Sequence, residues 1–179
     1  LIPEEGSVGA SGDLTPLSYV AATLSGEREV MFNGERRLAA DVHQELGWTP
    51  LVLRPKEALA LMNGTAVMTG LACLAYARAD YLLKLATRIT ALNVVALQGN
   101  PEHFDERLFA AKPHPGQMQV AAWLRQDLAI DAPTAPLHRL QDRYSLRCAP
   151  HVLGVLADSL NWLRGFIETE LNSANDNPI

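Results

Sequence analysis

The sequence predicts a mainly α-helical protein with one small β-hairpin. Two stretches, 65–97 and 150–171, carry apolar residues at spacings of three and four, which is the repeat of a helix with an apolar side. A third observation is the pair Asn33-Gly34, because both residues accept the positive φ angles of a tight two-residue turn. The strands beside that turn are short, so helices dominate the predicted fold.

The N-terminal part combines a loop, an apolar segment and the hairpin. A glycine-rich loop occupies 6–12, where glycine permits sharp turns, and an apolar segment follows from Leu17 to Leu24. The predicted strands at 30–32 and 35–38 flank the turn. These elements form a small β unit in an otherwise helical chain.

The longest apolar region is predicted to begin at Pro55, which suits the first helical position because the N–H that it lacks has no partner there. Gly64 is expected to loosen the pattern, and a long helix then continues to about Leu97, where 98–101 ends it. Nearly every face of this helix carries apolar residues. Such a helix is expected in the centre of a bundle or at a subunit interface.

Two further helices are predicted in the C-terminal half. The segment 112–117 breaks the chain before a helix from about Met118 to Leu128. The proline-rich connector 131–136 is too short to be a domain linker, and the last helix runs from about Pro150 to Leu171.

The ends of the chain predict a piece of a longer protein. The first residue is not Met, and the last five residues form a turn signal with no element after it. We expect this piece to contain a loop and hairpin part at 1–54 and a central helical part at 55–179.

The composition argues against several classes of protein. The net charge is −5 and Lys and Arg do not cluster, so nucleic acid is not the expected partner. Charged residues interrupt the longest apolar region, so no membrane span is expected. Cys73 and Cys148 are too few and too far apart for a disulfide framework, and no two of the five histidines are four residues apart, so no metal site is expected. We expect a cytoplasmic protein with free thiols.

The most informative feature is the tripeptide Ala10-Ser11-Gly12. Three small residues allow Gly12 N to attack the carbonyl carbon of Ala10, and loss of one water then closes a five-membered imidazolone. Loss of the Ser11 hydroxyl as a second water leaves an exocyclic methylidene. The product is a methylidene-imidazolone (MIO), an electrophile that ordinary side chains do not provide and that enzymes usually obtain from a cofactor.

Four segments together resemble the aromatic amino acid ammonia-lyases and aminomutases. They occur in that family's order and at about its spacing, and they are 6–18, 60–65, 141–147 and 175–178. The resemblance implies a long-helix bundle of the ammonia-lyase and fumarase-like type. It also implies an MIO formed autocatalytically from Ala10-Ser11-Gly12, no metal, and a homotetramer whose active sites are shared between subunits.

The resemblance assigns catalytic roles to several residues. Ser11 contributes the carbon that the substrate amine attacks. Tyr144 is expected near the electrophile, where it assists amine elimination or ring formation, and Asn63 is expected to donate to developing negative charge. The family's proton-abstracting tyrosine is expected before residue 1, whereas Tyr19 is expected to be a core residue.

Substrate binding is assigned in the same way. Arg147 is expected to hold the substrate carboxylate, because its planar guanidinium offers two parallel donors. Asn177 is the second expected carboxylate contact, and Gln141 completes the polar shell. Asp142 and Asp176 are expected to be structural supports.

The implied reaction is elimination of ammonia from an aromatic L-amino acid, with phenylalanine or a close analogue favoured, to give an arylacrylate. The same residues would serve a 2,3-aminomutase that makes a β-amino acid, or a histidine ammonia-lyase that makes urocanate. His151 stands where the family commonly has glutamine, a departure that argues against a plain histidine ammonia-lyase. The alternative from another class is a helical scaffold in which the tripeptide stays unmodified.

Overall fold

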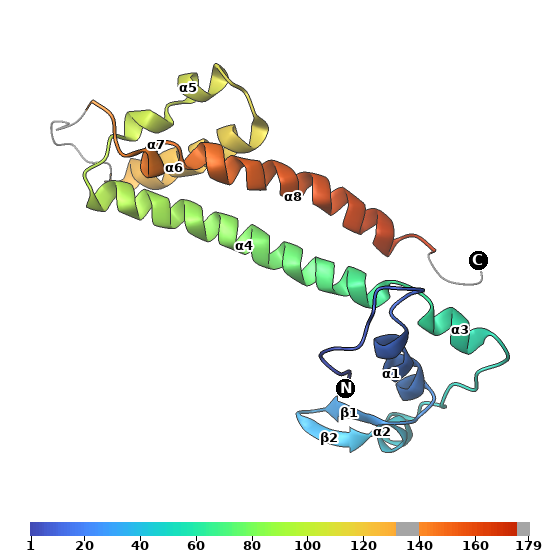
Figure 1. The fold of residues 1–179 in the computed structure, drawn as a ribbon. Helices are drawn as coiled ribbons and strands as arrows, with labels where there is room; N and C mark the ends of the chain where they lie inside the picture. Colours follow the sequence, from blue (N-terminus) through green and yellow to red (C-terminus); the bar gives the residue numbers. More distant parts are fainter. Residues whose placement is uncertain (132–139, 175–179) are drawn as a thin grey trace. The chain divides into compact units, whose positions relative to one another are not determined.

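The computed structural model describes residues 1–131 and 140–174. These residues form two compact units, Leu1–Cys73 with the chain from Ile167 onward, and Leu74–Phe166. Within the described residues all regular structure is helical except for one two-stranded sheet (Figure 1). The prediction of a mainly α-helical fold with one hairpin is therefore confirmed.

The first unit contains the predicted β-hairpin. Strand β1 (Glu29–Phe32) pairs antiparallel with β2 (Glu35–Leu38), and Phe32 lies opposite Glu35 beside the turn. Asn33 and Gly34 have φ angles of 51° and 84°, the left-handed values that a type I′ turn requires. The prediction made from this pair is confirmed.

Three short helices complete this part of the chain: α1 (Leu14–Leu24), α2 (Ala39–Leu46) and α3 (Glu57–Met62). Helix α1 contacts α3, and α2 contacts the hairpin. Helix α3 begins at Glu57, so the predicted start at Pro55 is wrong. The reason is that Lys56 has a φ angle of 75°, which turns the chain before the helix begins. The buried apolar side chains of α1 and α2 are Leu17, Ala21, Ala39 and Val42.

Helix α4 (Ala66–Ala96) is the long helix that the sequence predicts up to about Leu97. The chain leaves the helical conformation at 63–65, so the pattern is interrupted around Gly64 as expected. At the other end Gln98 has a φ angle of 51°, Gly99 N donates to Val94 O at 2.8 Å, and Gln98 N donates to Val95 O at 3.1 Å. These two hydrogen bonds form a Schellman motif, which ends the helix by satisfying its last carbonyls.

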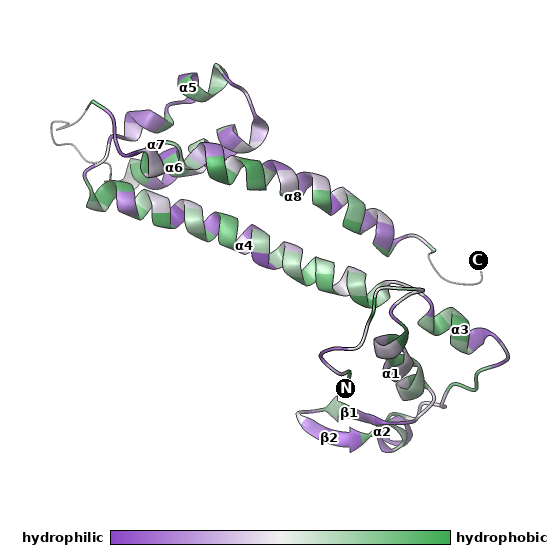
Figure 2. Ribbon diagram, viewed as in Figure 1, coloured by the Kyte–Doolittle hydropathy of each residue, from purple (hydrophilic) through white to green (hydrophobic). Residues whose placement is uncertain are grey.

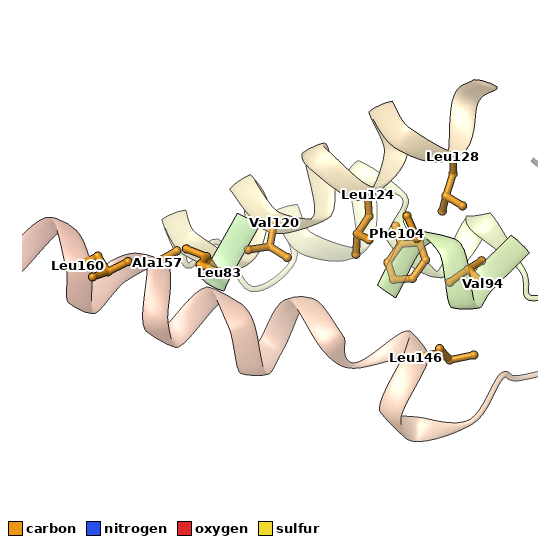
Figure 3. Close-up of a cluster of buried hydrophobic side chains, with 10 residues drawn as sticks. Leu83, Val94, Phe104, Val120, Leu124, Leu128, Leu146, Ala157 and Leu160 are labelled. Atoms are coloured by element: carbon orange, nitrogen blue, oxygen red, sulfur yellow. The ribbon is translucent and has the colours of Figure 1, made fainter. Parts of the chain in front are cut away.

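The second unit is built around a cluster of buried apolar side chains (Figure 3). In Figure 3 the side chains of Val120 and Leu124 point from α6 (Pro115–Asp131) toward the other helices of the cluster. Leu146 belongs to the same cluster and fixes the short helix α7 (Tyr144–Arg147), which carries two predicted site residues. Besides α4, the unit contains η1 (Pro101–Phe104), α5 (Glu106–Ala110), α6 (Pro115–Asp131), α7 (Tyr144–Arg147) and α8 (Ala149–Leu171).

Helix α6 begins at Pro115, earlier than the predicted Met118. Pro115 has no N–H, and the amide of Gly116 donates to Asp158 Oδ1 at 2.7 Å. The predicted break over 112–117 is therefore wrong in its second half, because a distant carboxylate satisfies an amide that has no partner inside the helix. Helix α8 begins one residue before the predicted Pro150.

Helices α6 and α8 contact each other through glycine backbone. A Cβ atom at Gly116 would overlap the carbonyl oxygen of Gly154. A Cβ atom at Gly154 would lie 2.5 Å from Gln117 N, closer than a methyl group and an amide can approach. Glycine at these two positions is therefore required for the packing of the second unit.

Helices α4 and α8 carry apolar residues on most of their turns (Figure 2). Many of these side chains are exposed. Large exposed apolar surfaces on helices are normally covered by other protein. The exposure agrees with the predicted place of α4 in a bundle or an interface. The most exposed members are Leu71, Leu74, Tyr81, Leu82, Leu92, Val152, Val155, Trp162, Phe166 and Leu171.

One stretch, Glu57–Ala96, is long and apolar enough to cross a membrane when only length and composition are considered. The helix is interrupted at 63–65, and Arg78 is the first charged residue after that break. The uncharged helical part from Ala66 to Ala77 is about 18 Å long at 1.5 Å per residue. A bilayer core is about 30 Å thick, so the expectation of no membrane span stays a prediction that helix geometry favours.

Replacing Gly154 by Ala should lower the free energy of unfolding by about 1–3 kcal/mol, because the added methyl group overlaps the α6 backbone. The matched control is Gly70→Ala in α4, where the new methyl group meets no atom within 4 Å. That variant should gain about 0.5–1 kcal/mol from better helix propensity. Urea unfolding followed by circular dichroism measures both, and equal midpoints for the two variants would contradict the proposed contact.

Candidate active site

The Ala10-Ser11-Gly12 loop has an unusual backbone conformation. Ser11 has a φ angle of 55° and Gly12 one of 94°, so both lie in the left-handed region. This region is uncommon for residues other than glycine, and such residues persist there only when their surroundings hold them. The loop is therefore already turned sharply at the residues whose atoms would close the ring.

Gly12 lies directly against the peptide between Asn63 and Gly64. A Cβ atom on Gly12 would be 2.6 Å from the Asn63 carbonyl carbon and 2.8 Å from Gly64 N. Glycine is required here for two reasons, the positive φ angle and the close approach of another backbone. The structure thus brings Asn63 next to the tripeptide, as the sequence predicts, while the catalytic role of its side chain stays a prediction.

Asp13 connects this loop to the start of α4. Its backbone N donates to Gly64 O at 2.7 Å, and its side-chain oxygens accept from Ser7 Oγ at 2.7 Å and from Met68 N at 2.8 Å. Met68 N is one of the first amides of α4, which have no partners inside the helix. The buried carboxylate therefore caps α4 from a distant part of the sequence and keeps the tripeptide against Asn63 and Gly64.

Sequence analysis did not identify Asp13 as a site residue. Its position before the apolar segment at 17–24 is typical of an N-cap, and it does occupy the N-cap position of α1. However, its side chain makes no capping hydrogen bond to α1. The available signal would have pointed to the wrong helix, because the true partner is 55 residues away along the chain.

The second unit carries the predicted Tyr144 and Arg147. The guanidinium carbon of Arg147 lies 5.1 Å from the centre of the Tyr144 ring, and Arg147 Nη1 lies 3.6 Å from Cys148 Sγ. Arg147 Nε is buried without a hydrogen-bond partner, and no carboxylate within the described part of the chain pairs with this side chain. A half-buried guanidinium without an acid is suited to bind an anionic group.

Asp142 fixes the segment that leads into α7. Asp142 Oδ2 accepts from Asn100 N at 2.6 Å, and Asp142 N donates to His103 Nε2 at 3.0 Å. These contacts tie the segment to the chain that follows α4, which agrees with the expected role of Asp142 as a structural support. The neighbouring Gln141 is exposed, and its expected role in the polar shell stays a prediction.

A cavity of about 310 Å³ adjoins Tyr144 in the second unit. The lining is largely apolar, and the residues in it that carry a hydroxyl group are Tyr144, Ser145 and Thr90. Such a mixture of apolar walls and a few polar groups is typical of small-molecule sites. The remaining lining residues are Ala86, Cys148, Ala149, Val152 and Leu153.

His151 lies one helical turn from Arg147 at the start of α8. Its ring centre is 5.3 Å from that of Phe109. Partial desolvation lowers the pKa of His151 below its ordinary value, and the positive charges of Lys112 and Arg147 lower it further. The side chain is therefore expected to be neutral at neutral pH and to leave the local positive charge to Lys112 and Arg147.

Several other predicted residues have clear positions. Tyr19 is half-buried in α1 with the guanidinium of the exposed Arg28 3.8 Å from its ring centre, so it lies at the margin of the core and the expected core position is met only in part. Asn177 and Asp176 lie outside the described residues. Within 1–131 and 140–174, no group of three or more His, Cys, Asp or Glu side chains is arranged to hold a metal ion.

Asp13→Ala should lower the free energy of unfolding by about 1–3 kcal/mol, because Ser7 Oγ and Met68 N each lose an acceptor in a partly buried contact. The matched control is Glu27→Ala, an exposed acid near the end of α1, which should change stability by less than about 0.5 kcal/mol. Chemical unfolding of both variants measures the difference. Similar values for the two would contradict the anchoring role of Asp13.

Comparison with known proteins gives consistent results. The family described as aromatic amino acid lyase matches residues 1–179. A histidine ammonia-lyase of Koribacter versatilis is 43% identical over 182 residues, and a tyrosine 2,3-aminomutase of Chondromyces crocatus is 43% identical over 201 residues. Both alignments cover 100% of this chain but only 35% and 38% of those two proteins.

The fold is also similar to solved structures. The phenylalanine aminomutase of Pantoea agglomerans superimposes with a TM-score of 0.86 at 34% sequence identity. That comparison covers 99% of this chain and 38% of the other. The chain thus spans little more than a third of the length of each of these three relatives.

Proposed function

Since this chain belongs to the aromatic amino acid lyase family, we propose that the protein containing it eliminates ammonia from an aromatic L-amino acid to give an arylacrylate. The observation that carries the proposal is the left-handed turn at Ser11 and Gly12, pressed against the Asn63 peptide. Phenylalanine or a close analogue is the substrate that we place first. Histidine and tyrosine are named for relatives and are its competitors.

The residues present fit an MIO made from Ala10-Ser11-Gly12. Ser11 has the hydroxyl that dehydration would remove, and Gly12 is held where no other residue fits. When formed, the group supplies the electrophile that makes an amine a better leaving group. The turned backbone and its contacts to Asn63 and Asp13 support ring closure at this place, because a strained loop needs surroundings that fix it.

The chain's own side chains supply the remaining functions. Arg147 binds the substrate carboxylate through two parallel hydrogen bonds and so orients the amino acid. Tyr144, next to that guanidinium and at the edge of the apolar cavity, holds or transfers a proton at its hydroxyl oxygen. Asn63 donates a hydrogen bond beside Gly12, where negative charge would develop.

We also propose that the active protein is a homotetramer with active sites shared between subunits. The exposed apolar side chains of α4 and α8 would be covered in such an assembly. Exclusion of water there would also strengthen the electrostatic contacts of Arg147.

The closest competing function is a 2,3-aminomutase, which the aminomutase names of two relatives favour. Both reactions begin with loss of the amine, and they differ in whether ammonia returns to the β carbon. Product analysis with phenylalanine, tyrosine and histidine separates them. Arylacrylate and free ammonia support the lyase, whereas accumulating β-amino acid supports the mutase and urocanate supports the histidine enzyme.

In the full-length protein, Ser11→Ala should abolish turnover, because the hydroxyl that must leave is absent. Intact mass spectrometry should find the wild-type protein lighter than its encoded sequence by two waters per chain, and the variant without that loss. Ser18→Ala is the matched control, since the Ser18 hydroxyl bonds only to the carbonyl of Thr15 within α1. An unmodified, inactive wild-type protein would favour the helical scaffold instead.

Arg147→Lys should raise KM about tenfold or more with a smaller effect on kcat, because an ammonium group cannot reproduce the bidentate contact to a carboxylate. Arg143→Lys, at an exposed arginine just before α7, is the control and should behave like the wild type. Steady-state kinetics of both variants gives the answer. Unchanged KM in Arg147→Lys would remove the assigned role of carboxylate binding.

A further inference from the structure

Within the first unit, a hydrogen bond joins the residue before α4 to the last turn of α8. Thr65 Oγ1 donates to Glu170 Oε1 at 2.8 Å, and the contact is partly buried. Thr65 immediately precedes α4, and Glu170 lies in the last turn of α8. The partners are 105 residues apart in sequence, so they meet only when the chain between them has folded.

Thr65 belongs to the turn that supports the tripeptide. In the turn 63–65, the Asn63 peptide lies against Gly12, the Gly64 carbonyl accepts from Asp13 N, and the Thr65 hydroxyl donates to Glu170. The turn is therefore held from the loop side by Asp13 and from the α8 side by Glu170. A shift of this turn would move the surface on which Gly12 rests.

The electrostatics explain why an acid is placed there. A carboxylate in the last turn of a helix is disfavoured by the negative end of the helix dipole. Glu170 occupies such a place on α8, but its oxygen also lies at the positive end of α4 through the contact with Thr65. The α4 terminus thus attracts two carboxylates, those of Asp13 and Glu170.

We propose that Thr65 and Glu170 are positioning residues for ring closure, which hold the turn 63–65 against Gly12 while the Ala10-Ser11-Gly12 loop cyclises. The inference rests on the proposed function, because it concerns formation of the same electrophile. An amide nitrogen is planar and a weak nucleophile, so closure requires a backbone kept in the turned shape. Neither residue contacts substrate atoms in this assignment, and their effect is on how fast the ring forms.

The experiment uses the full-length protein, expressed in a short pulse and sampled over time by intact mass spectrometry. Thr65→Val removes the hydroxyl and keeps the side-chain shape, and we expect ring closure about tenfold slower, in line with loss of a hydrogen bond to a charged group. Glu170→Ala should have the same effect. Thr65→Ser retains the donor, so it should close at nearly the wild-type rate. Glu170→Gln retains an acceptor without the charge, so its rate should fall between those of Glu170→Ala and the wild type.

Two controls separate positioning from general destabilisation. Thr23→Val makes the same substitution in the first unit but removes only a hydrogen bond to the Tyr19 carbonyl within α1, and should leave ring closure unchanged. In Thr65→Val, kcat divided by the fraction of cyclised chains should equal the wild-type value, which a damaged active site would not give.

Each outcome has a definite meaning. Slow closure in Thr65→Val with rescue by Thr65→Ser supports the proposal. A wild-type protein that cyclises and a Thr65→Val variant that does so equally fast would overturn the positioning role and leave the proposed function standing. Equal slowing in Thr23→Val or in Thr65→Ser would also overturn it, and a wild-type protein without the mass loss would overturn both proposals.

Discussion

The contact on which the electrophile loop depends is the buried carboxylate of Asp13 at the N-terminus of α4. Burying a charge is unfavourable unless hydrogen bonds compensate it. Here the Ser7 hydroxyl and the Met68 amide donate to the carboxylate, and the helix dipole of α4 favours its negative charge. The same residue donates its backbone N–H to Gly64, so one side chain fixes both the helix start and the loop that precedes α1.

The same solution recurs at one other helix start, in the second unit. Asp158 accepts from the amide of Gly116 in the first turn of α6, so a carboxylate from a distant segment satisfies an amide that has no partner inside the helix. Asp142 acts differently, because the Asn100 side chain caps η1 locally by accepting from Glu102 N, and Asp142 accepts from the backbone amide of Asn100 itself. That contact fixes the segment that leads to Tyr144 and Arg147.

Each unit carries one group of candidate residues, and the two groups differ in how many contacts they make. The electrophile loop has its supporting contacts within the first unit. In the second unit Arg147 Nε is buried without a hydrogen-bond partner among the described residues, and none of the described carboxylates pairs with its guanidinium. An arginine in this condition is suited to a ligand that brings oxygen acceptors, which is the role that the proposed function gives it.

The sequence by itself determined the hairpin at Asn33-Gly34 and the long helices α4 and α8, because local conformational preference and periodic patterns specify such features. The expected place of Asn63 beside the tripeptide came from the resemblance of four segments to the family, and no local pattern specifies it. It placed the starts of α3 and α6 wrongly, since Lys56 adopts a left-handed conformation and Asp158 caps Gly116 from another helix. Only the tertiary structure decided that Asp13 serves α4 instead of α1, and that Glu170 reaches Thr65. A hydrogen bond between residues 55 or 105 positions apart depends on where folding brings two segments, and neither segment carries that information alone.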